Sequence, residues 1–213
     1  MTCCSTEGTN KFFSKSANHY AKRFRKKGLD AAQNLLASGL RSLGIRSKSL
    51  LEIGCGVGGL HLTLLKEGAS SSVGVEISEG MLAKAKEIAG EMGLAERARY
   101  HVGDFMSTNG SIPPAHIVIL DKVVCCYAEP GELMQKSSGK AMELYAVSYP
   151  RDSFLAKFLF TSSAFIGTVL RWSFHPYYHQ TSFLENTITG CGFEEVFSDT
   201  TVIWQVKIFK RRG

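Results

Sequence analysis

A run of glycines at the end of an apolar segment constrains this chain more than any other feature. The run reads LEIGCGVGG over 51–59, between a predicted strand over 49–53 and a predicted helix that starts at Gly58. Glycine lets the backbone turn sharply and approach a bound ligand closely. Gly54, Gly56 and Gly59 also satisfy the pattern G-x-G-x-x-G. The loop therefore predicts a nucleotide-type ligand, and a dinucleotide remains admissible on this feature alone.

Predicted strands alternate with predicted helices through most of the chain. Strands separated by helices of about ten or more residues require right-handed crossovers and a parallel sheet, so the fold class is a doubly wound α/β domain. The pattern predicts helices over 11–27, 29–43, 58–67, 79–92, 131–136, 152–166 and 181–189. It predicts strands over 49–53, 72–76, 98–103, 115–120 and 141–148.

The chain ends in two further strand-like segments, 193–197 and 201–209, separated only by Ser198, Asp199 and Thr200. So short a link cannot hold a crossover helix, and the pair is expected to form an antiparallel hairpin. With 213 residues, 44% of them hydrophobic, one domain is expected. Its parts are cap helices over 1–47, a core over 48–148, substrate-side helices and a lid over 149–192, and the hairpin over 193–213.

Three acidic residues lie where predicted strands end, at the edge where open α/β sheets bind ligands. Glu76 comes 22 residues after Gly54, and a carboxylate there can accept hydrogen bonds from both hydroxyls of a ribose. Glu52 lies inside the glycine motif, where dehydrogenases usually carry a small or apolar residue. Asp104 can accept a hydrogen bond from an adenine amine while Phe105 covers the ring.

The ordered set resembles the motifs of class I S-adenosylmethionine (SAM) dependent methyltransferases. The set is Glu-x-Gly-x-Gly-x-Gly over 52–58, the acid at 76, Gly-Asp-Phe over 103–105 and Asp121 at the end of the fourth strand. The likeness covers about 48–148 and the terminal hairpin. It implies a Rossmann-like sheet of seven strands in the order 3-2-1-4-5-7-6, in which only strand seven is antiparallel.

The same resemblance implies roles for individual residues. SAM would be the cofactor and S-adenosylhomocysteine the product. Glu76 would hold the ribose, and Ile77 or Met81 would pack on the adenine ring unless they are ordinary core residues. The remaining cofactor-binding candidates are Glu52, Gly54, Cys55, Gly56 and Gly58 at the methionine part, Asp104 and Phe105 at the adenine, and Asp121.

The acceptor is expected to be a small molecule, with O-methylation favoured. The segments 120–127 and 148–152 resemble small-molecule enzymes loosely related to magnesium-protoporphyrin O-methyltransferases. His175 and His179 are candidate general bases, and Tyr20 and Tyr127 are candidates to close over the transferred methyl group. For each of these four side chains, simple packing is an alternative. Nucleic acid is not an expected partner, because the chain lacks the Asn-Pro-Pro-Tyr type of loop.

Charge and cysteine content leave other functions open. The net charge of +6 is concentrated in basic runs over 22–27 and 207–212, which could be solvated faces or a patch for RNA or a membrane surface. An RNA methyltransferase, a SAM sensor and a nicotinamide-dependent oxidoreductase are therefore alternatives. The six cysteines lack C-x-x-C spacing and the N-terminus lacks a secretory signal, so no metal site and a cytoplasmic location are expected. The sequence does not specify an oligomeric state.

Overall fold

The computed structural model describes residues 6–154, 156–157 and 176–213. Within these residues the chain alternates between strands and helices, as the sequence pattern predicts. The helices are α1 (Thr6–Lys27), α2 (Ala31–Leu43), α3 (Gly59–Lys66), α4 (Glu79–Glu91), α5 (Phe105–Thr108), α6 (Pro130–Ser138) and α8 (Thr181–Gly190). The strands are β1 (Ser49–Ile53), β2 (Ser71–Glu76), β3 (Ala98–Val102), β4 (Ala115–Asp121), β5 (Ala141–Pro150), β6 (Phe193–Thr200) and β7 (Trp204–Arg211).

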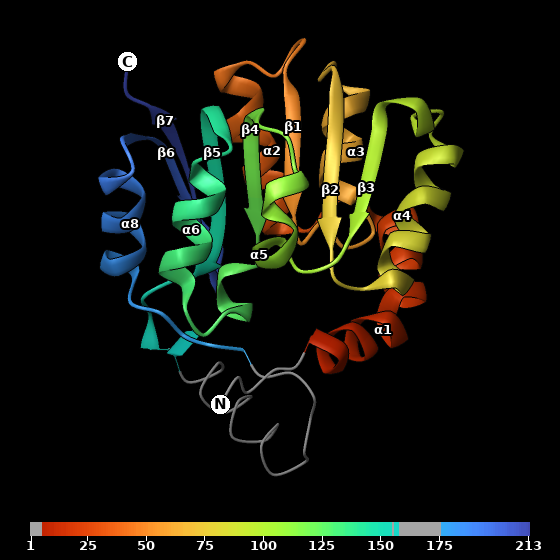
Figure 1. Cartoon of the computed structure of the whole chain (residues 1–213), viewed down its shortest axis with the longest axis horizontal. Helices are drawn as coiled ribbons and strands as arrows, with labels where there is room; N and C mark the ends of the chain where they lie inside the picture. Colours follow the sequence, from red (N-terminus) through yellow and green to blue (C-terminus); the bar gives the residue numbers. More distant parts are fainter. Residues whose placement is uncertain (1–5, 155, 158–175) are drawn as a thin grey trace.

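The seven strands form one sheet in the order β3-β2-β1-β4-β5-β7-β6. Strands β1 to β5 are parallel to their neighbours among themselves, and β7 is antiparallel to both β5 and β6. This confirms the predicted sheet order and the terminal hairpin. The carboxyl ends of the parallel strands meet at one edge, and α1 lies beyond that edge (Figure 1). The turns that carry the glycine loop and the three acidic residues are therefore brought together.

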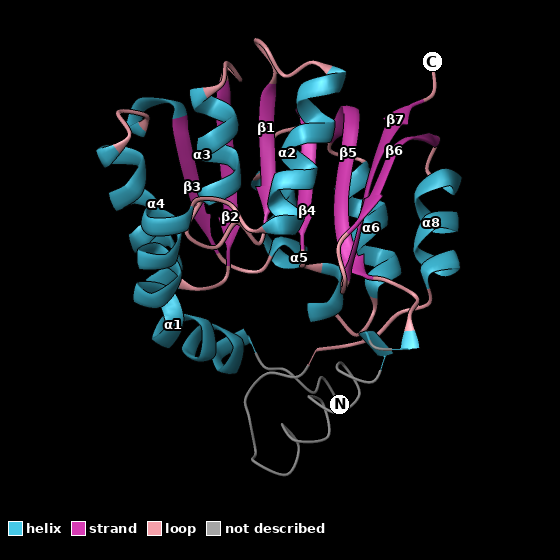
Figure 2. Cartoon of the chain, turned by 180° about the vertical axis from the view of Figure 1, so that it is seen from behind, coloured by secondary structure: helices cyan, strands magenta, loops and turns pink. Residues whose placement is uncertain are grey.

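Two hydrophobic cores lie on opposite faces of the sheet because successive side chains of a strand point to opposite faces. On β1, Leu50 packs with α2 and α3, whereas Leu51 and Ile53 pack with the helices of the other face. On β4, Ile117 and Ile119 belong to the first core and Val118 to the second. Figures 1 and 2 show α2 and α3 covering one face and α6 and α8 covering the other. Because the central strands are buried on both faces, their sequences contain runs of consecutive apolar residues and do not alternate regularly with polar residues.

The N-terminal helix α1 is fastened beside the binding edge by contacts to α4. Ser14 Oγ accepts a hydrogen bond from Gly80 N at 3.2 Å and lies 2.9 Å from Ser78 Oγ, the oxygen that caps α4. Gly80 has no room for a side chain, since a Cβ there would lie 2.9 Å from Ser14 Cα. Close packing of the two helices places the inner face of α1 over the carboxyl ends of the strands.

The turn of the terminal hairpin lies later than predicted. Ser198, Asp199 and Thr200 belong to β6, and the chain turns at Thr201, Val202 and Ile203. Thr201 Oγ1 accepts hydrogen bonds from the backbone N–H groups of Ile203 and Trp204, which stabilises this turn. The polar residues of β6 are tolerated because β6 is an exposed edge strand, so their turn propensity is a misleading signal.

Several charges of the two basic runs are used within the fold. Arg25 forms ion pairs with Glu87 and Glu91 on α4, and Lys207 forms ion pairs with Glu185 and Glu195. Arg211 donates to the backbone carbonyls of residues 138 and 141 and lies over a phenylalanine ring. These contacts favour the interpretation of the runs as structural. Among the helices described here, none combines the length and apolarity needed to cross a bilayer.

Candidate functional site

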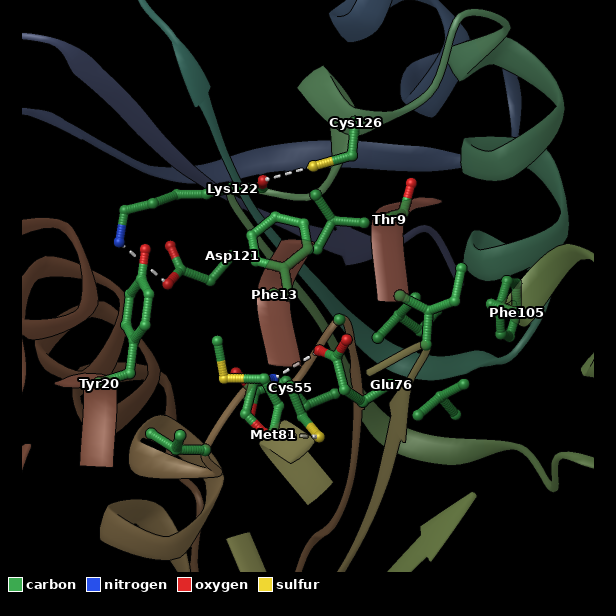
Figure 3. Close-up of a pocket in the computed structure, with 18 of the residues that line it drawn as sticks. Thr9, Phe13, Tyr20, Cys55, Glu76, Met81, Phe105, Asp121, Lys122 and Cys126 are labelled. Atoms are coloured by element: carbon green, nitrogen blue, oxygen red, sulfur yellow. Dashed lines mark hydrogen bonds and ion pairs between the residues drawn. The ribbon is translucent and has the colours of Figure 1, made fainter. Parts of the chain in front are cut away.

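A cavity of about 640 Å³ lies at the carboxyl edge of the sheet. This volume falls in the range of roughly 300–1,000 Å³ that is usual for small-molecule sites. One wall is built from the ends of β1, β2 and β3 and the turns that follow them, and the opposite wall comes from α1, α2 and the turn after β4. Side chains from both walls point into the cavity (Figure 3). Every cofactor-binding residue expected from the sequence lines it except Gly58, whose neighbours Val57 and Gly59 do.

The glycine loop has the backbone conformation that only glycine adopts without strain. Gly54, Gly56 and Gly58 have φ angles of +66°, +54° and +80°. At Gly54 a Cβ atom would also lie 2.4 Å from Val123 Cγ2, so the loop packs directly on the turn after β4. At Gly56 a Cβ would meet nothing within 4 Å. The loop thus combines a tight turn with an open approach for a ligand.

Glu76 connects the end of β2 to the glycine loop. Its Oε2 accepts a hydrogen bond from Gly56 N at 2.8 Å, and its Oε1 accepts one from Ser78 N at 2.9 Å. Burial raises the pKa of Glu76, and the backbone N–H groups partly offset this effect. Glu76 lines the cavity, and a carboxylate there suits a pair of neighbouring hydroxyl groups.

Glu52 has a partner that the sequence interpretation missed. Its Oε2 lies 2.6 Å from Nδ1 of His61 and 3.3 Å from the backbone N of the same residue. Both side chains are almost fully buried, with 2% of Glu52 and none of His61 exposed. Burial raises the pKa of Glu52, whereas the bonds from His61 act in the opposite direction. The available signal was a histidine in the first turn of a helix that is otherwise largely apolar.

Asp104 and Phe105 follow β3 at the far end of the cavity. Asp104 Oδ1 accepts hydrogen bonds from Tyr127 Oη at 2.5 Å and from Met106 N at 3.0 Å. The pKa of Tyr127 is raised by burial and then by the Asp104 carboxylate. Phe105 is buried and reaches the cavity wall, as do Ile77 and Met81. The structure therefore places Tyr127 beside Asp104, the carboxylate expected to bind the adenine amine.

The opposite wall carries charged and aromatic residues that the sequence interpretation largely missed. Lys122 has a φ of +60°, which is rare outside glycine, and its backbone N–H donates to Ser148 Oγ. Lys122 Nζ lies 2.6 Å from Asp30 Oδ2 and 3.2 Å from Asp121 Oδ2. Helix α1 and the segment after β5 complete the wall with Thr9, Phe13, Tyr20, Arg23, Phe24 and Tyr177.

The two histidines proposed as bases have different outcomes. His175 lies outside the described residues. His179 does not line the cavity, because its Nε2 lies 2.9 Å from the carbonyl oxygen of Tyr127 and its ring stacks on Tyr177. A carbonyl only accepts, so Nε2 carries a proton and donates it. Burial lowers the pKa of His179. In this geometry His179 fastens the turn after β4 instead of facing an acceptor.

The cysteines of the turn after β4 are structural neighbours of Lys122. The Sγ atoms of Cys125 and Cys126 lie 3.3 Å and 3.6 Å from the carbonyl oxygen of Lys122, and Cys126 reaches the cavity wall. Among the described residues, no group of three or more His, Cys, Asp or Glu side chains could hold a metal ion.

Comparisons with known proteins agree with this geometry. Residues 50–137 match a family described as "Methyltransferase domain". A segment of 65 residues is 34% identical to a ribosomal protein L11 methyltransferase of Haemophilus influenzae, and covers 30% of this chain and 22% of that relative.

The structure as a whole is similar to that of magnesium protoporphyrin IX methyltransferase from Synechocystis with bound SAH. The TM-score is 0.75 at 16% identity, with coverage of 96% of this chain and 98% of the other. It is also similar to an O-methyltransferase family 2 protein from Planctomyces limnophilus in complex with apigenin. There the TM-score is 0.70 at 16% identity, over 96% and 62% of the two chains. Residues 50–137 thus match a methyltransferase domain, and the sheet topology is that of the Rossmann-like methyltransferase fold.

Proposed function

We propose that this protein transfers a methyl group from SAM to a small-molecule acceptor, with an oxygen as the favoured methyl-accepting atom. The observation that carries the proposal is a single cavity with two unlike walls. One wall joins the glycine loop to Glu52, Glu76 and Asp104, and the other is aromatic and charged. A cavity of this form can hold a cofactor and an acceptor side by side.

The residues of the first wall fit SAM. The Glu76 carboxylate lines the cavity as an acceptor for ribose hydroxyls, and Glu52 offers a buried carboxylate for the ammonium group. Asp104, Phe105, Ile77 and Met81 surround the space left for an adenine. When bound, SAM supplies a methyl group on a positively charged sulfur, which transfers by in-line displacement. The protein contributes alignment and exclusion of water.

The second wall supports a small, flat acceptor. Phe13, Tyr20 and Phe24 come from one helix, α1, and offer ring surfaces on which a planar molecule can stack. Of two proteins similar in fold, one is named for magnesium protoporphyrin IX and the other was solved in complex with apigenin, and both compounds are planar. A macromolecular acceptor is the competing possibility, since the curated relative is named for a ribosomal protein.

The cofactor assignment is tested by thermal unfolding in the presence of SAM, SAH or NAD. At a ligand concentration of about 100 times Kd, binding adds about 2.7 kcal/mol of stability. For a chain of this size we expect SAM and SAH to raise Tm by roughly 5–10 °C. NAD is expected to leave Tm unchanged. A shift with NAD and none with SAM would instead support a nicotinamide-dependent oxidoreductase.

The acceptor class is tested by transfer of a labelled methyl group from SAM. The protein would be incubated with labelled SAM and either a small-molecule fraction, total RNA or a protein fraction. Label in a small organic product, stable to nuclease and protease, supports the proposal. Label recovered only in RNA or protein would contradict it, and binding of SAM without any transfer would indicate a sensor.

A further inference from the structure

A buried chain of hydrogen bonds runs from the cofactor wall into the α3 face of the sheet. Glu52 at the end of β1 bonds to Nδ1 of His61 on α3, and Nε2 of His61 lies 3.2 Å from Oη of Tyr100 on β3. Tyr100 Oη in turn donates to the carbonyl oxygen of Ala85 on α4 at 3.3 Å. The chain thus joins four elements beneath the glycine loop.

The donors and acceptors of this chain define where its protons lie. A carboxylate oxygen only accepts, so Nδ1 of His61 donates to Glu52. Tyr100 has one hydroxyl proton, which is directed to Ala85, so its oxygen accepts from Nε2 of His61. Each ring nitrogen of His61 thus faces an oxygen that can accept a proton from it, Oε2 of Glu52 on one side and Oη of Tyr100 on the other.

His61 occupies only one oxygen of the carboxylate. Both contacts from His61, through Nδ1 and through the backbone N–H, reach Oε2 of Glu52. Among the described residues Oε1 has no hydrogen-bond partner, and Glu52 lines the cavity. One oxygen is therefore anchored and the other is available to a ligand.

The groups around Glu52 make its ionised form energetically costly unless His61 offsets the negative charge. Its titratable neighbours are Cys55 in the glycine loop, Glu76 on β2, Tyr100 on β3 and Asp121 on β4. Each of these is neutral or negative. An isolated buried carboxylate is strongly disfavoured and tends to take up a proton. In the described part of the structure, His61 is the one side chain against Glu52 that can supply a positive charge.

We propose that His61 is a positioning residue, which keeps Glu52 ionised and aims its free oxygen at the ammonium group of SAM, while Tyr100 fixes the imidazole from the other side. The inference rests on the proposed binding of SAM. His61 does not touch the cofactor itself in this arrangement. Its effect reaches the cofactor only through the carboxylate.

The test compares SAM affinity, measured by calorimetry between about pH 5 and pH 9, for three variants and the unaltered protein. His61→Leu is expected to weaken binding by roughly tenfold or more at neutral pH, because Glu52 loses its counter-charge. The affinity of every form falls as pH decreases through the pKa of Glu52 in the ligand-free protein. Loss of His61 raises that pKa further, so the fall begins at a higher pH in His61→Leu.

Conservative variants separate positioning from packing. His61→Asn keeps a short donor near the position of Nδ1 and is expected to bind SAM better than His61→Leu. Tyr100→Phe removes only the outer bond, and we expect a loss of a few-fold. If all three variants bind SAM with unaltered affinity and an unaltered pH profile, the inference is wrong. Failure of the unaltered protein to bind SAM would instead contradict the proposed function.

A second measurement does not depend on the stability of the variants. In nitrogen-15 spectra of the histidines of the unaltered protein, both ring nitrogens of His61 are expected to carry protons near neutral pH. Their signals are expected to move when SAM binds to the neighbouring carboxylate. A neutral His61 ring whose signals ignore SAM would overturn the inference even if His61→Leu failed to fold.

Discussion

Replacing Glu76 with alanine is expected to weaken SAM binding by roughly 100-fold while the protein remains folded. The carboxylate is expected to accept one hydrogen bond from each ribose hydroxyl, and bonds to charged groups contribute about 1.5–3 kcal/mol each. Loss of about 3 kcal/mol corresponds to roughly two powers of ten in Kd. The variant also leaves Gly56 N and Ser78 N without their acceptor, which loosens the glycine loop.

Folding is expected to survive this change for an electrostatic reason. Burial raises the pKa of Glu76, so its ionised form is a cost to the native state at neutral pH, and alanine removes that cost. Gly56 lines the cavity, so water can reach its freed N–H group.

Calorimetry with SAM, together with a thermal unfolding curve, measures both expected effects of Glu76→Ala. A matched control is Glu79→Ala, which removes the same charge three residues along the chain, outside the cavity lining. We expect the control to bind SAM like the unaltered protein. Equal affinity for the two variants would mean that Glu76 does not hold the ribose. In that case the cofactor would have to be bound in a different orientation.

The fold was predictable because one pattern repeats at every crossover. Predicted strands such as 49–53 are followed by a turn and then by a helix long enough to cross back over the sheet. Topology then follows from general rules of parallel sheets. The hairpin turn was less predictable, because Ser198, Asp199 and Thr200 have turn propensity but occupy an exposed edge strand. Local propensity there is overridden by pairing with β7.

The candidate site was predictable only where residues lie at or just after the carboxyl ends of strands. Glu52, Glu76 and Asp104 have this position, and the structure brings all three to one cavity. His61 lies only nine positions from Glu52, but one histidine in a largely apolar helix does not reveal that pairing. Lys122 gave no signal, because its partner is distant along the chain. Lys122 Nζ is 92 positions from its partner Asp30. His179 shows the reverse case, since a histidine among aromatic residues resembles a base in sequence but bonds to a backbone carbonyl.

The cluster around Lys122 leads to a prediction about stability. Lys122 Nζ lies between Asp30, which caps α2, and Asp121 at the end of β4, and its side chain is 24% exposed. Without the Lys122 ammonium group, the negatively charged carboxylates of Asp30 and Asp121 would face each other in a partly buried place. We expect Lys122→Met to lower the free energy of unfolding by about 2 kcal/mol. This corresponds to a decrease in Tm of roughly 4–8 °C.

The pH dependence of that loss identifies its cause. The Lys122 ammonium group holds the pKa of Asp30 below its usual value, against the effect of burial. A group whose pKa is lowered by folding contributes stability above its unfolded pKa of about 4 and loses it as pH falls through the lower folded value. The difference in Tm between the two proteins should therefore be constant above about pH 5 and shrink in more acidic solution.

Thermal unfolding between about pH 3 and pH 8 tests this prediction, with Lys84→Met as the control. Lys84 also forms an ion pair, but with Glu87 on the surface of α4, where such pairs contribute about 0.5 kcal/mol or less. A loss for Lys122→Met that is no larger than that of the control would contradict a structural role for the cluster. A large loss that persists unchanged at low pH would assign the effect to the contact of Lys122 with Trp204, whose ring centroid lies 5.6 Å from Nζ. Only a loss that disappears in acid shows that Lys122 joins the cap helices to the sheet through its charge.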